Sequence, residues 1–271
     1  MCRWLVFLSE EDFLLADVVI EPANSLSKQS FDGGFHPGLC ETNNMVLNAD
    51  GFGLGWYGRS GAAIFRSVTP AWNNRNLREL CRSVESSCVF AHVRAATPGS
   101  VISEANCHPF RCGPLLFQHN GHIEQYARIK RRVLAELRDD VFGWLEGTTD
   151  SEACFALVLN FLEPALLRDD HDRAAPARVP VAAMRAAMLG AIALLRKFLA
   201  EEQARADARR ALDSRGMKLR PRSRSRFMSA GDRRLLEHEL RADRRPHGRR
   251  HALLRPGEHG AVTSSLSVEK I

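Results

Sequence analysis

Short apolar runs in the first half of the chain predict the strands of a sheet. Residues 3–8 form an apolar run suited to a buried strand, which would hold the N-terminus at the end of a sheet. The glycine-rich residues 51–58 and the apolar residues 62–68 flank a short turn and predict two paired strands. Residues 88–94 and 114–119 predict two more. Together these segments are typical of an antiparallel sheet.

Apolar residues recur at helical spacing between and after these strands. Three segments have this pattern: residues 76–84, 124–137 and 151–162. The apolar stretch 181–200 is interrupted by three basic residues, so it predicts an amphipathic core helix and not a membrane-spanning one. Because strands and helices are both substantial, the predicted fold class is α+β.

The composition indicates a globular protein of a reducing compartment. The chain has 271 residues, of which 45% are hydrophobic, enough for a sizeable core. No opening stretch has the features of a secretory signal, so we expect Cys2 to be the first residue after removal of Met1. The seven cysteines are odd in number and scattered through apolar segments. This favours a cytoplasmic location.

The net charge of +6 is concentrated at the end of the chain. From residue 201 onward there are 18 Lys and Arg against 10 Asp and Glu, which leaves 20 against 22 in the preceding residues. A nearly neutral body has no electrostatic footprint for nucleic acid. The arginine-dense residues 220–255 lack a sustained apolar period. We therefore expect a domain over residues 2–200 and a basic tail over 201–271 that is poorly ordered, divergent or incomplete.

Cysteine at the second position is chemically special. A small side chain there permits removal of Met1, which leaves a thiol and a free α-amine on one residue. An α-amine has an ordinary pKa of about 7.7–8.0 and can take the thiol proton and return it to a leaving amine. Alone, the pattern also fits an ordinary cysteine after an initiator. Support must therefore come from other segments.

A strand-like segment, CVFAHVRAAT, contains candidate binding residues near its end. It places His92 and Arg94 on one face and leads into a turn at Thr97. An arginine at a strand end can bind a carboxylate through two hydrogen bonds. The alternative for Arg94 is a surface salt bridge.

Two later segments contain candidates for charge stabilisation. In LLFQHNGHI an apolar run stops at Asn120 and Gly121, where a side-chain amide and a glycine N–H can form an oxyanion hole. An Asn-Gly turn is the alternative. In TTDSE, Asp150 precedes a helical pattern and can hold a substrate ammonium, cap the helix, or do both.

Four segments in this order resemble the class II glutamine amidotransferase domain: Cys2, HVRAAT, HNG and TDSE. Further stretches resemble its stand-alone branch, which includes the fungal glutathione-degrading subunit and the ergothioneine-pathway γ-glutamyl amidohydrolase. They are NSLSKQS, NADGFGLGWYG, PAW and EANCHPF. The resemblance implies the four-layer αββα sandwich of the N-terminal-nucleophile hydrolases. It also implies that Cys2 is the nucleophile and that Asn120 and Gly121 form the oxyanion hole.

The same resemblance implies a γ-glutamyl substrate. Arg94 would bind its α-carboxylate and Asp150 its α-ammonium, while Thr97 and His92 would line or support the pocket. The expected reaction is cysteine-dependent hydrolysis of a γ-glutamyl amide, in a glutathione-like peptide or glutamine, with release of glutamate. The alternative is a catalytically impaired subunit that acts as a binding partner.

The expected partners and cofactors follow from the same residues. The fungal relatives imply a separate peptidase-like subunit, and we expect no nucleic acid or membrane partner. Cys107, His108 and Cys112 lack a second well-spaced ligand pair, so we expect them to be buried structural residues. The predicted chemistry requires neither a metal nor another cofactor.

Overall fold

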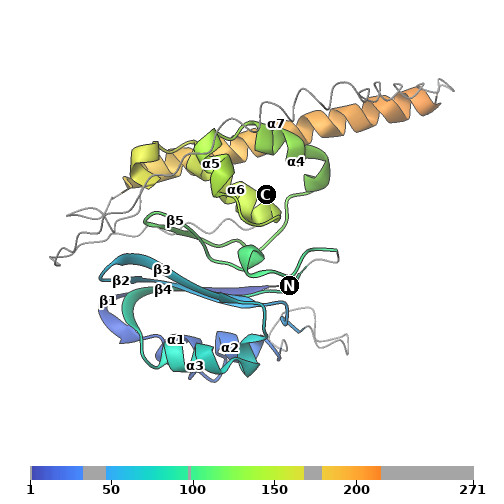
Figure 1. The fold of residues 1–271 in the computed structure, drawn as a ribbon. Helices are drawn as coiled ribbons and strands as arrows, with labels where there is room; N and C mark the ends of the chain where they lie inside the picture. Colours follow the sequence, from blue (N-terminus) through green and yellow to red (C-terminus); the bar gives the residue numbers. More distant parts are fainter. Residues whose placement is uncertain (1, 33–46, 97–98, 168–178, 215–271) are drawn as a thin grey trace, which may run out of the picture. The chain divides into compact units, whose positions relative to one another are not determined.

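The structure, a computed structural model, describes residues 2–32, 47–96, 99–167 and 179–214 (Figure 1). The described residues up to 203 belong to one compact unit, and residues 204–214 belong to a second. The predicted boundary at residue 200 and the predicted character of the tail remain predictions.

A four-stranded antiparallel sheet forms the first layer. Its strands are β1 (Arg3–Leu14), β2 (Phe52–Gly58), β3 (Gly61–Ser67) and β4 (Glu85–Val93), in the order β1-β4-β2-β3. The four strands predicted in this part of the chain are confirmed. The prediction that the first is buried is wrong, because among the described strands β1 lies at the sheet edge and Leu8 is 52% exposed.

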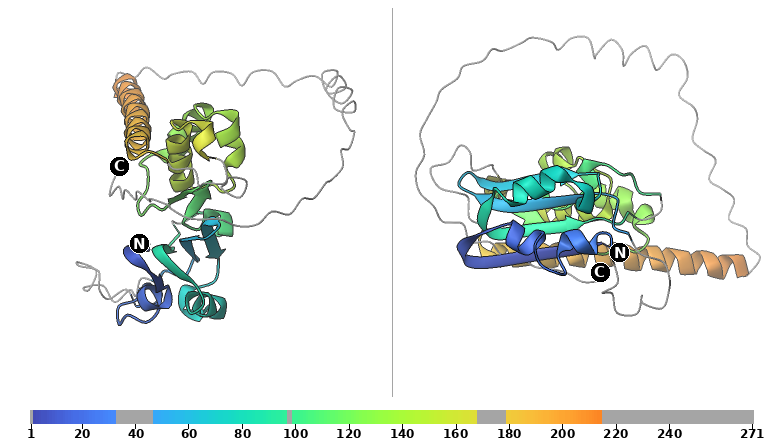
Figure 2. Two further views of the ribbon diagram at one scale, coloured as in Figure 1. Left: turned by 90° about the vertical axis from the view of Figure 1, so that its left-hand side faces the viewer. Right: turned by 90° about the horizontal axis from the view of Figure 1, so that it is seen from below.

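Three helices cover one face of this sheet: α1 (Ala16–Val19), α2 (Leu26–Gln29) and α3 (Arg75–Cys81), preceded by the 3-10 turn η1 (Ala71–Asn73). Figure 1 and the view from below in Figure 2 show them side by side across the strands. Strand side chains alternate between faces, so Val89, Ala91 and Val93 of β4 pack with these helices. Phe90 and His92 point to the opposite face and are also buried. Strand β4 is therefore a central strand covered on both sides.

Glycines lie on the opposite face of β2. A Cβ atom at Gly55 would lie 2.7 Å from the ring of Pro109 and 3.0 Å from Leu116, and one at Gly53 would collide with the carbonyl oxygen of His108. Only glycine permits this close approach of residues 108–116 to the sheet. The sequence GFGLG thus sets the distance between the sheet and the next layer.

The next layer is a hairpin with helices packed on it. Strands β5 (Phe110–Cys112) and β6 (Leu115–Phe117) form the hairpin, which follows the 3-10 turn η2 (Glu104–Asn106). The helices are α4 (Tyr126–Ala135), α5 (Asp139–Trp144), α6 (Asp150–Asn160) and α7 (Val181–Ser214), with η3 (Pro164–Leu167) before α7. The short strand predicted at 114–119 and the helices at 76–84, 124–137 and 151–162 are confirmed with shifted ends, whereas α1, α2, α5 and β5 were not predicted.

A second hydrophobic core lies among these helices. Residues 151–159 of α6 are all buried, so this helix is covered on every side. The predicted amphipathic helix at 181–200 is confirmed by α7, whose buried residues Met184, Ala187, Ala191 and Leu195 follow helical spacing. In the described ranges, no helix combines the length and apolar character needed to cross a bilayer.

The predicted mixture of helix and sheet is therefore confirmed. The described residues contain one four-stranded sheet and one two-stranded hairpin. The four-layer αββα sandwich remains a prediction.

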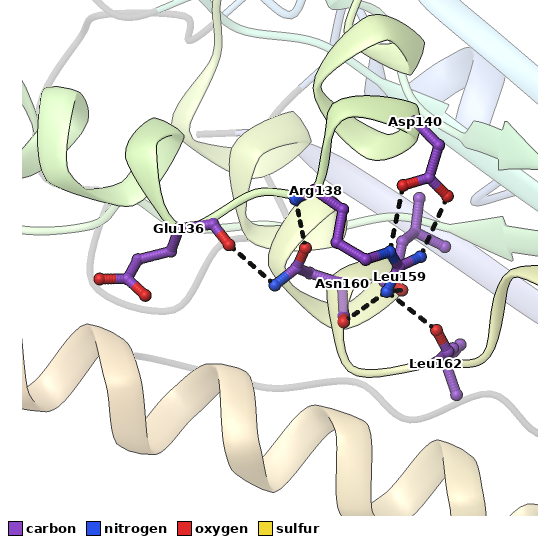
Figure 3. Close-up of polar contacts among 6 residues, drawn as sticks. All are labelled: Glu136, Arg138, Asp140, Leu159, Asn160 and Leu162. Carbon is purple, nitrogen blue, oxygen red and sulfur yellow. Dashed lines mark hydrogen bonds and ion pairs between the residues drawn. The ribbon is translucent and has the colours of Figure 1, made fainter.

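Arg138 secures the C-terminal end of α6 (Figure 3). Its guanidinium donates to the carbonyl oxygens of Asn160, at 2.6 Å, and Leu162, at 3.0 Å. Its own N–H donates to the Asn160 side chain at 2.7 Å, and that side chain donates to the carbonyl of Glu136 at 3.0 Å. These contacts satisfy carbonyl groups that a helix end leaves without partners.

We predict that Arg138→Ala lowers the free energy of unfolding by about 2 kcal/mol, because several charge-assisted hydrogen bonds are lost. Asp140→Asn is the matched control, since it removes only the exposed carboxylate that also pairs with Arg138 and should cost at most ~1 kcal/mol. Urea denaturation followed by circular dichroism measures both. Equal losses of unfolding free energy in the two variants would show that Arg138 stabilises the protein through its ion pair with Asp140 and not through its contacts at the end of α6.

Candidate active site

Cys2 is held at the end of the edge strand beside the end of the central strand. Arg3 pairs with Val93, so Cys2 lies next to the residues that follow β4. The backbone N–H of Ala95 donates to Cys2 Sγ at 3.2 Å, and the thiol lies 3.5 Å from the Ala95 carbonyl oxygen. The cysteine is half-buried. The backbone of Ala95 thus positions the sulfur of a residue that is partly exposed.

Arg94 is buried, with 4% of its surface exposed. Its guanidinium donates to the carbonyl oxygen of Val101, at 3.1 and 3.2 Å, and to the hydroxyl of Ser100 at 2.8 Å. Within the described part of the chain no carboxylate pairs with it. The alternative of a surface salt bridge is therefore wrong. A buried cation with only neutral acceptors is suited to receive an anion from outside the protein.

The segment after β6 lies against Cys2. Gln118 donates to the carbonyl oxygen of Leu5 at 3.1 Å, and Asn120 Nδ2 donates to the carbonyl oxygen of Cys2 at 3.1 Å. Gly121 is exposed, and no acceptor among the described residues takes its N–H. An amide nitrogen has two N–H groups. The segment of Asn120 and Gly121 therefore brings donor groups close to Cys2.

Asp150 is the first residue of α6 and not its cap. The cap is Thr149, whose hydroxyl accepts the N–H of Glu152 at 3.1 Å, so the helix-cap alternative for Asp150 is wrong. The Asp150 carboxylate accepts the N–H groups of Ile123, at 2.7 Å, and Ser151, at 2.9 Å. Each carboxylate oxygen retains further lone pairs. Asp150 thus fixes the segment after Gly121 and keeps acceptor capacity for a ligand.

Two buried histidines stack between the sheet and the hairpin layer. The rings of His92 and His108 are 4.3 Å apart, and neither finds a hydrogen bond of ordinary geometry among the described residues. Burial lowers the pKa of His92 to about 3, although the nearby backbone of His119 weakly opposes this shift. Burial also lowers the pKa of His108 well below its usual range. Both rings are therefore neutral packing groups at neutral pH.

His119 connects the Asn120 segment to α6. Its Nδ1 lies 2.9 Å from the hydroxyl of Ser151. Burial lowers the pKa of His119, and the charge of Asp150 partly opposes this. A Cβ atom at Gly121 would lie 2.9 Å from His119 Nε2, so the absence of a side chain lets this segment pack on the ring.

The other thiols of this region are poor nucleophiles. Burial raises the pKa of Cys107 to about 11 and that of Cys154 to about 12. They are protonated at neutral pH. Cys107 and His108 are buried, as expected of structural residues, whereas Cys112 is only half-buried. Across the described ranges, no cluster of three or more His, Cys, Asp or Glu side chains could hold a metal ion.

Hydrogen bonds connect Cys2 with Ala95, which follows Arg94, and with Asn120, while Asp150 contacts the following segment at Ile123. Thr97 lies outside the described residues. Sequence reasoning missed Asp50, which accepts the N–H of Ala96 at 2.7 Å, and Asn106, which bridges two loops of the site. Asp50 lies in NADGFGLGWYG and Asn106 in EANCHPF, two stretches that were identified only by their resemblance to the stand-alone branch of the family. Nothing in a linear pattern shows where a side-chain amide or carboxylate finds its partner.

The two neutral histidines predict how stability depends on pH. In the unfolded chain a histidine protonates near pH 6.5, whereas His92 and His108 resist protonation when folded. The unfolded state then binds more protons, so stability is full above about pH 6.5 and is lost as pH falls toward 3, with a slope of about 1.4 kcal/mol per pH unit per histidine. We expect a lower free energy of unfolding at pH 5 than at pH 7.5, measured by urea denaturation.

The variant His108→Phe keeps a stacked ring and should flatten this dependence. Burial raises the pKa of Glu152, which gives the pH dependence of stability a contribution of opposite sign. Because Glu152 is present in both proteins, the difference between wild type and His108→Phe excludes this contribution. His122→Asn, at an exposed position, controls for the loss of a histidine as such. An identical slope in wild type and His108→Phe would contradict the assignment.

Three comparisons relate the chain to known proteins. A probable glutamine amidotransferase, DUG3, from Saccharomyces cerevisiae is 41% identical over 169 residues, which is 60% of this chain and 46% of that protein. A gamma-glutamyl-hercynylcysteine sulfoxide hydrolase from Mycolicibacterium smegmatis is 32% identical over 59% of this chain and 63% of its own length. The chain thus spans about half the length of the curated relatives that it matches.

A solved glutamine aminotransferase class-II domain protein from Silicibacter pomeroyi aligns with 25% identity over 59% of this chain and 55% of that chain, with a TM-score of 0.40. The family model of the class-II glutamine amidotransferases matches residues 27–195. The match includes Arg94, Asn120, Gly121 and Asp150, while Cys2 precedes it. The chain belongs to the class II glutamine amidotransferases.

Proposed function

We propose that this chain is an amidohydrolase that cleaves the γ-glutamyl amide bond of a glutathione-like peptide or of glutamine, with Cys2 as nucleophile. The observation that carries the proposal is the convergence on Cys2 of two distant segments. Ala95 contacts its thiol, and Asn120 contacts its carbonyl group. Arg94, the buried cation without an anionic partner among the described residues, directly precedes Ala95.

The charges of the site complement the head of the substrate. A γ-glutamyl group carries one carboxylate and one ammonium on its α-carbon. Arg94 would bind the carboxylate through its guanidinium, and Asp150 would bind the ammonium through lone pairs that its backbone donors leave open. His92 would support this pocket from the sheet, and Thr97 would line it. The yeast amidotransferase and the mycobacterial γ-glutamyl hydrolase support the same substrate class by their names.

The chemistry requires only groups of the chain once Met1 is removed. The α-amine of Cys2 takes the thiol proton, and the thiolate attacks the γ-carbonyl carbon of the substrate. Asn120 Nδ2 and the N–H of Gly121 stabilise the oxyanion. The amine returns the proton to the leaving nitrogen as the C–N bond breaks, which leaves a γ-glutamyl thioester. Water activated by the same amine hydrolyses the thioester, releases glutamate and restores the thiol.

The proposal extends to the setting of the protein. The αββα sandwich would be the fold of a domain over residues 2–200, followed by a basic tail over 201–271. Support comes from the helix-covered sheet with a second helical core on its other side. The free thiols of Cys2, Cys81, Cys107 and Cys154 are compatible with a cytoplasmic enzyme. A separate peptidase-like subunit is the proposed protein partner.

We predict that protein shown by mass spectrometry to lack Met1 releases glutamate from glutathione, from glutamine or from both. Cys2→Ala should abolish this release, by at least about 1000-fold, because the nucleophile is lost. Cys81→Ala is the matched control, since it removes a fully buried thiol whose pKa is raised to about 12 on the helical face of the sheet.

Two outcomes would contradict the proposal. Equal release by Cys2→Ala and wild type would exclude Cys2 as the nucleophile. No release by wild type with a free Cys2 amine, with glutamate still bound in calorimetry, would favour the catalytically impaired subunit.

A further inference from the structure

Asn106 connects the two loops that carry the charged groups of the site. It ends the 3-10 turn η2 and has 1% of its surface exposed. Its amide nitrogen donates to the carbonyl oxygen of Val101 at 2.9 Å and to the hydroxyl of Thr148 at 3.2 Å. Its amide oxygen accepts the N–H of Thr148 at 2.8 Å. This buried side chain thus links two segments, one that lies five residues before it in the chain and one that lies 42 residues after it.

At one end of this link, Val101 belongs to the loop that binds the Arg94 side chain. The carbonyl oxygen of Val101 accepts from both terminal nitrogens of the Arg94 guanidinium as well as from Asn106. Val101 and Ile102 are 57% and 54% exposed, so little apolar packing fixes this loop. Its position depends on these polar contacts.

The Thr148 end is the loop that begins α6. Thr148 precedes the cap residue Thr149, which in turn precedes Asp150. Buried Glu152 holds the same loop from the other side by accepting the N–H groups of Glu146, at 2.9 Å, and Gly147, at 2.8 Å. The loop is therefore clamped between Asn106 and Glu152.

We propose that Asn106 is a positioning residue that sets the separation between the Arg94 guanidinium and the Asp150 carboxylate, and thereby the selectivity for substrates that carry both an α-carboxylate and an α-ammonium. The proposal rests on the function proposed above for the identity of the head group. A zwitterionic head is bound well only when its two partners are held at a fixed spacing. The planar amide of Asn106, with three hydrogen bonds, is a rigid connector between them.

Removal of this connector should affect recognition of the ammonium more than the chemical step. In Asn106→Ala the Thr148 loop loses two bonds and the Val101 loop loses one, while the contacts of Cys2 with Ala95 and Asn120 do not involve Asn106. We expect KM for the γ-glutamyl substrate to rise about tenfold and kcat to change less than about threefold.

The discriminating measurement pairs each substrate with its analogue that lacks the α-amino group: glutathione with glutaryl-cysteinylglycine, and glutamine with glutaramate. Wild type should prefer the amino-bearing member, and Asn106→Ala should reduce the ratio of kcat/KM values about tenfold. Asn160→Ala is the matched control, because it removes another structural amide, at the far end of α6. That variant should lower stability and leave the ratio unchanged.

A further variant, Gly147→Ala, disturbs the link without removing Asn106, and Gly143→Ala is its control. A Cβ atom at Gly147 would collide with Asn106 Oδ1 and lie 2.8 Å from Glu152 Oε2 and 2.9 Å from the carbonyl oxygen of Ala105. Gly147→Ala should therefore reduce the substrate ratio in the same direction. Gly143→Ala meets nothing within 4 Å and should not.

Calorimetric binding of glutamate and glutarate separates this inference from the proposed function. A loss of preference for glutamate in Asn106→Ala supports the positioning role even if wild type releases no product. If wild type turns over substrate and both Asn106→Ala and Gly147→Ala keep its full preference for the α-amino group, the positioning role is overturned and the proposed function stays intact. Wild type that neither turns over nor binds glutamate would overturn both.

Discussion

The close approach of residues 108–116 to strand β2 is the contact on which the rest of the structure depends. Gly53 and Gly55 leave room for the His108 carbonyl, Pro109 and Leu116, so the hairpin layer packs directly on the sheet. This contact places His108 on His92 and brings the segment after β6 to the end of β1. Without it, Asn120 would not reach Cys2.

Burial at this interface has an electrostatic cost. Two imidazole rings and one guanidinium are removed from water, and the rings meet no hydrogen-bond partner among the described residues. The histidines avoid the cost of a buried charge by remaining neutral, as their lowered pKa values show. Arg94 cannot do so, because an arginine stays protonated. The candidate site therefore retains one fixed positive charge, on the residue that precedes the Ala95 contact with the Cys2 thiol.

The first turn of α6 organises the other half of the site. Asp150, Ser151 and Glu152 are consecutive, and each bonds a different partner: the Ile123 N–H, the His119 ring, and the N–H groups at 146 and 147. A helical turn points successive side chains in different directions, so three neighbours can secure three sites at once. With α6 buried on every side and Arg138 bonded at its far end, this turn has a rigid support.

The sequence by itself determined the mixture of strands and helices, the core helix at 181–200 and the candidate residues of the site. Those conclusions depend on local periodicity and on motifs, both of which are written along the chain. Short elements such as α1, α2 and β5 were missed because their few residues hold no full period.

Only the tertiary structure decided that β1 is an edge strand, that Thr149 and not Asp150 caps α6, and that Arg94 is buried. The bond between Ala95 and Cys2 joins residues 93 positions apart, and the Asn106 link to Thr148 spans 42. Such contacts arise only when distant segments pack, so no local pattern encodes them.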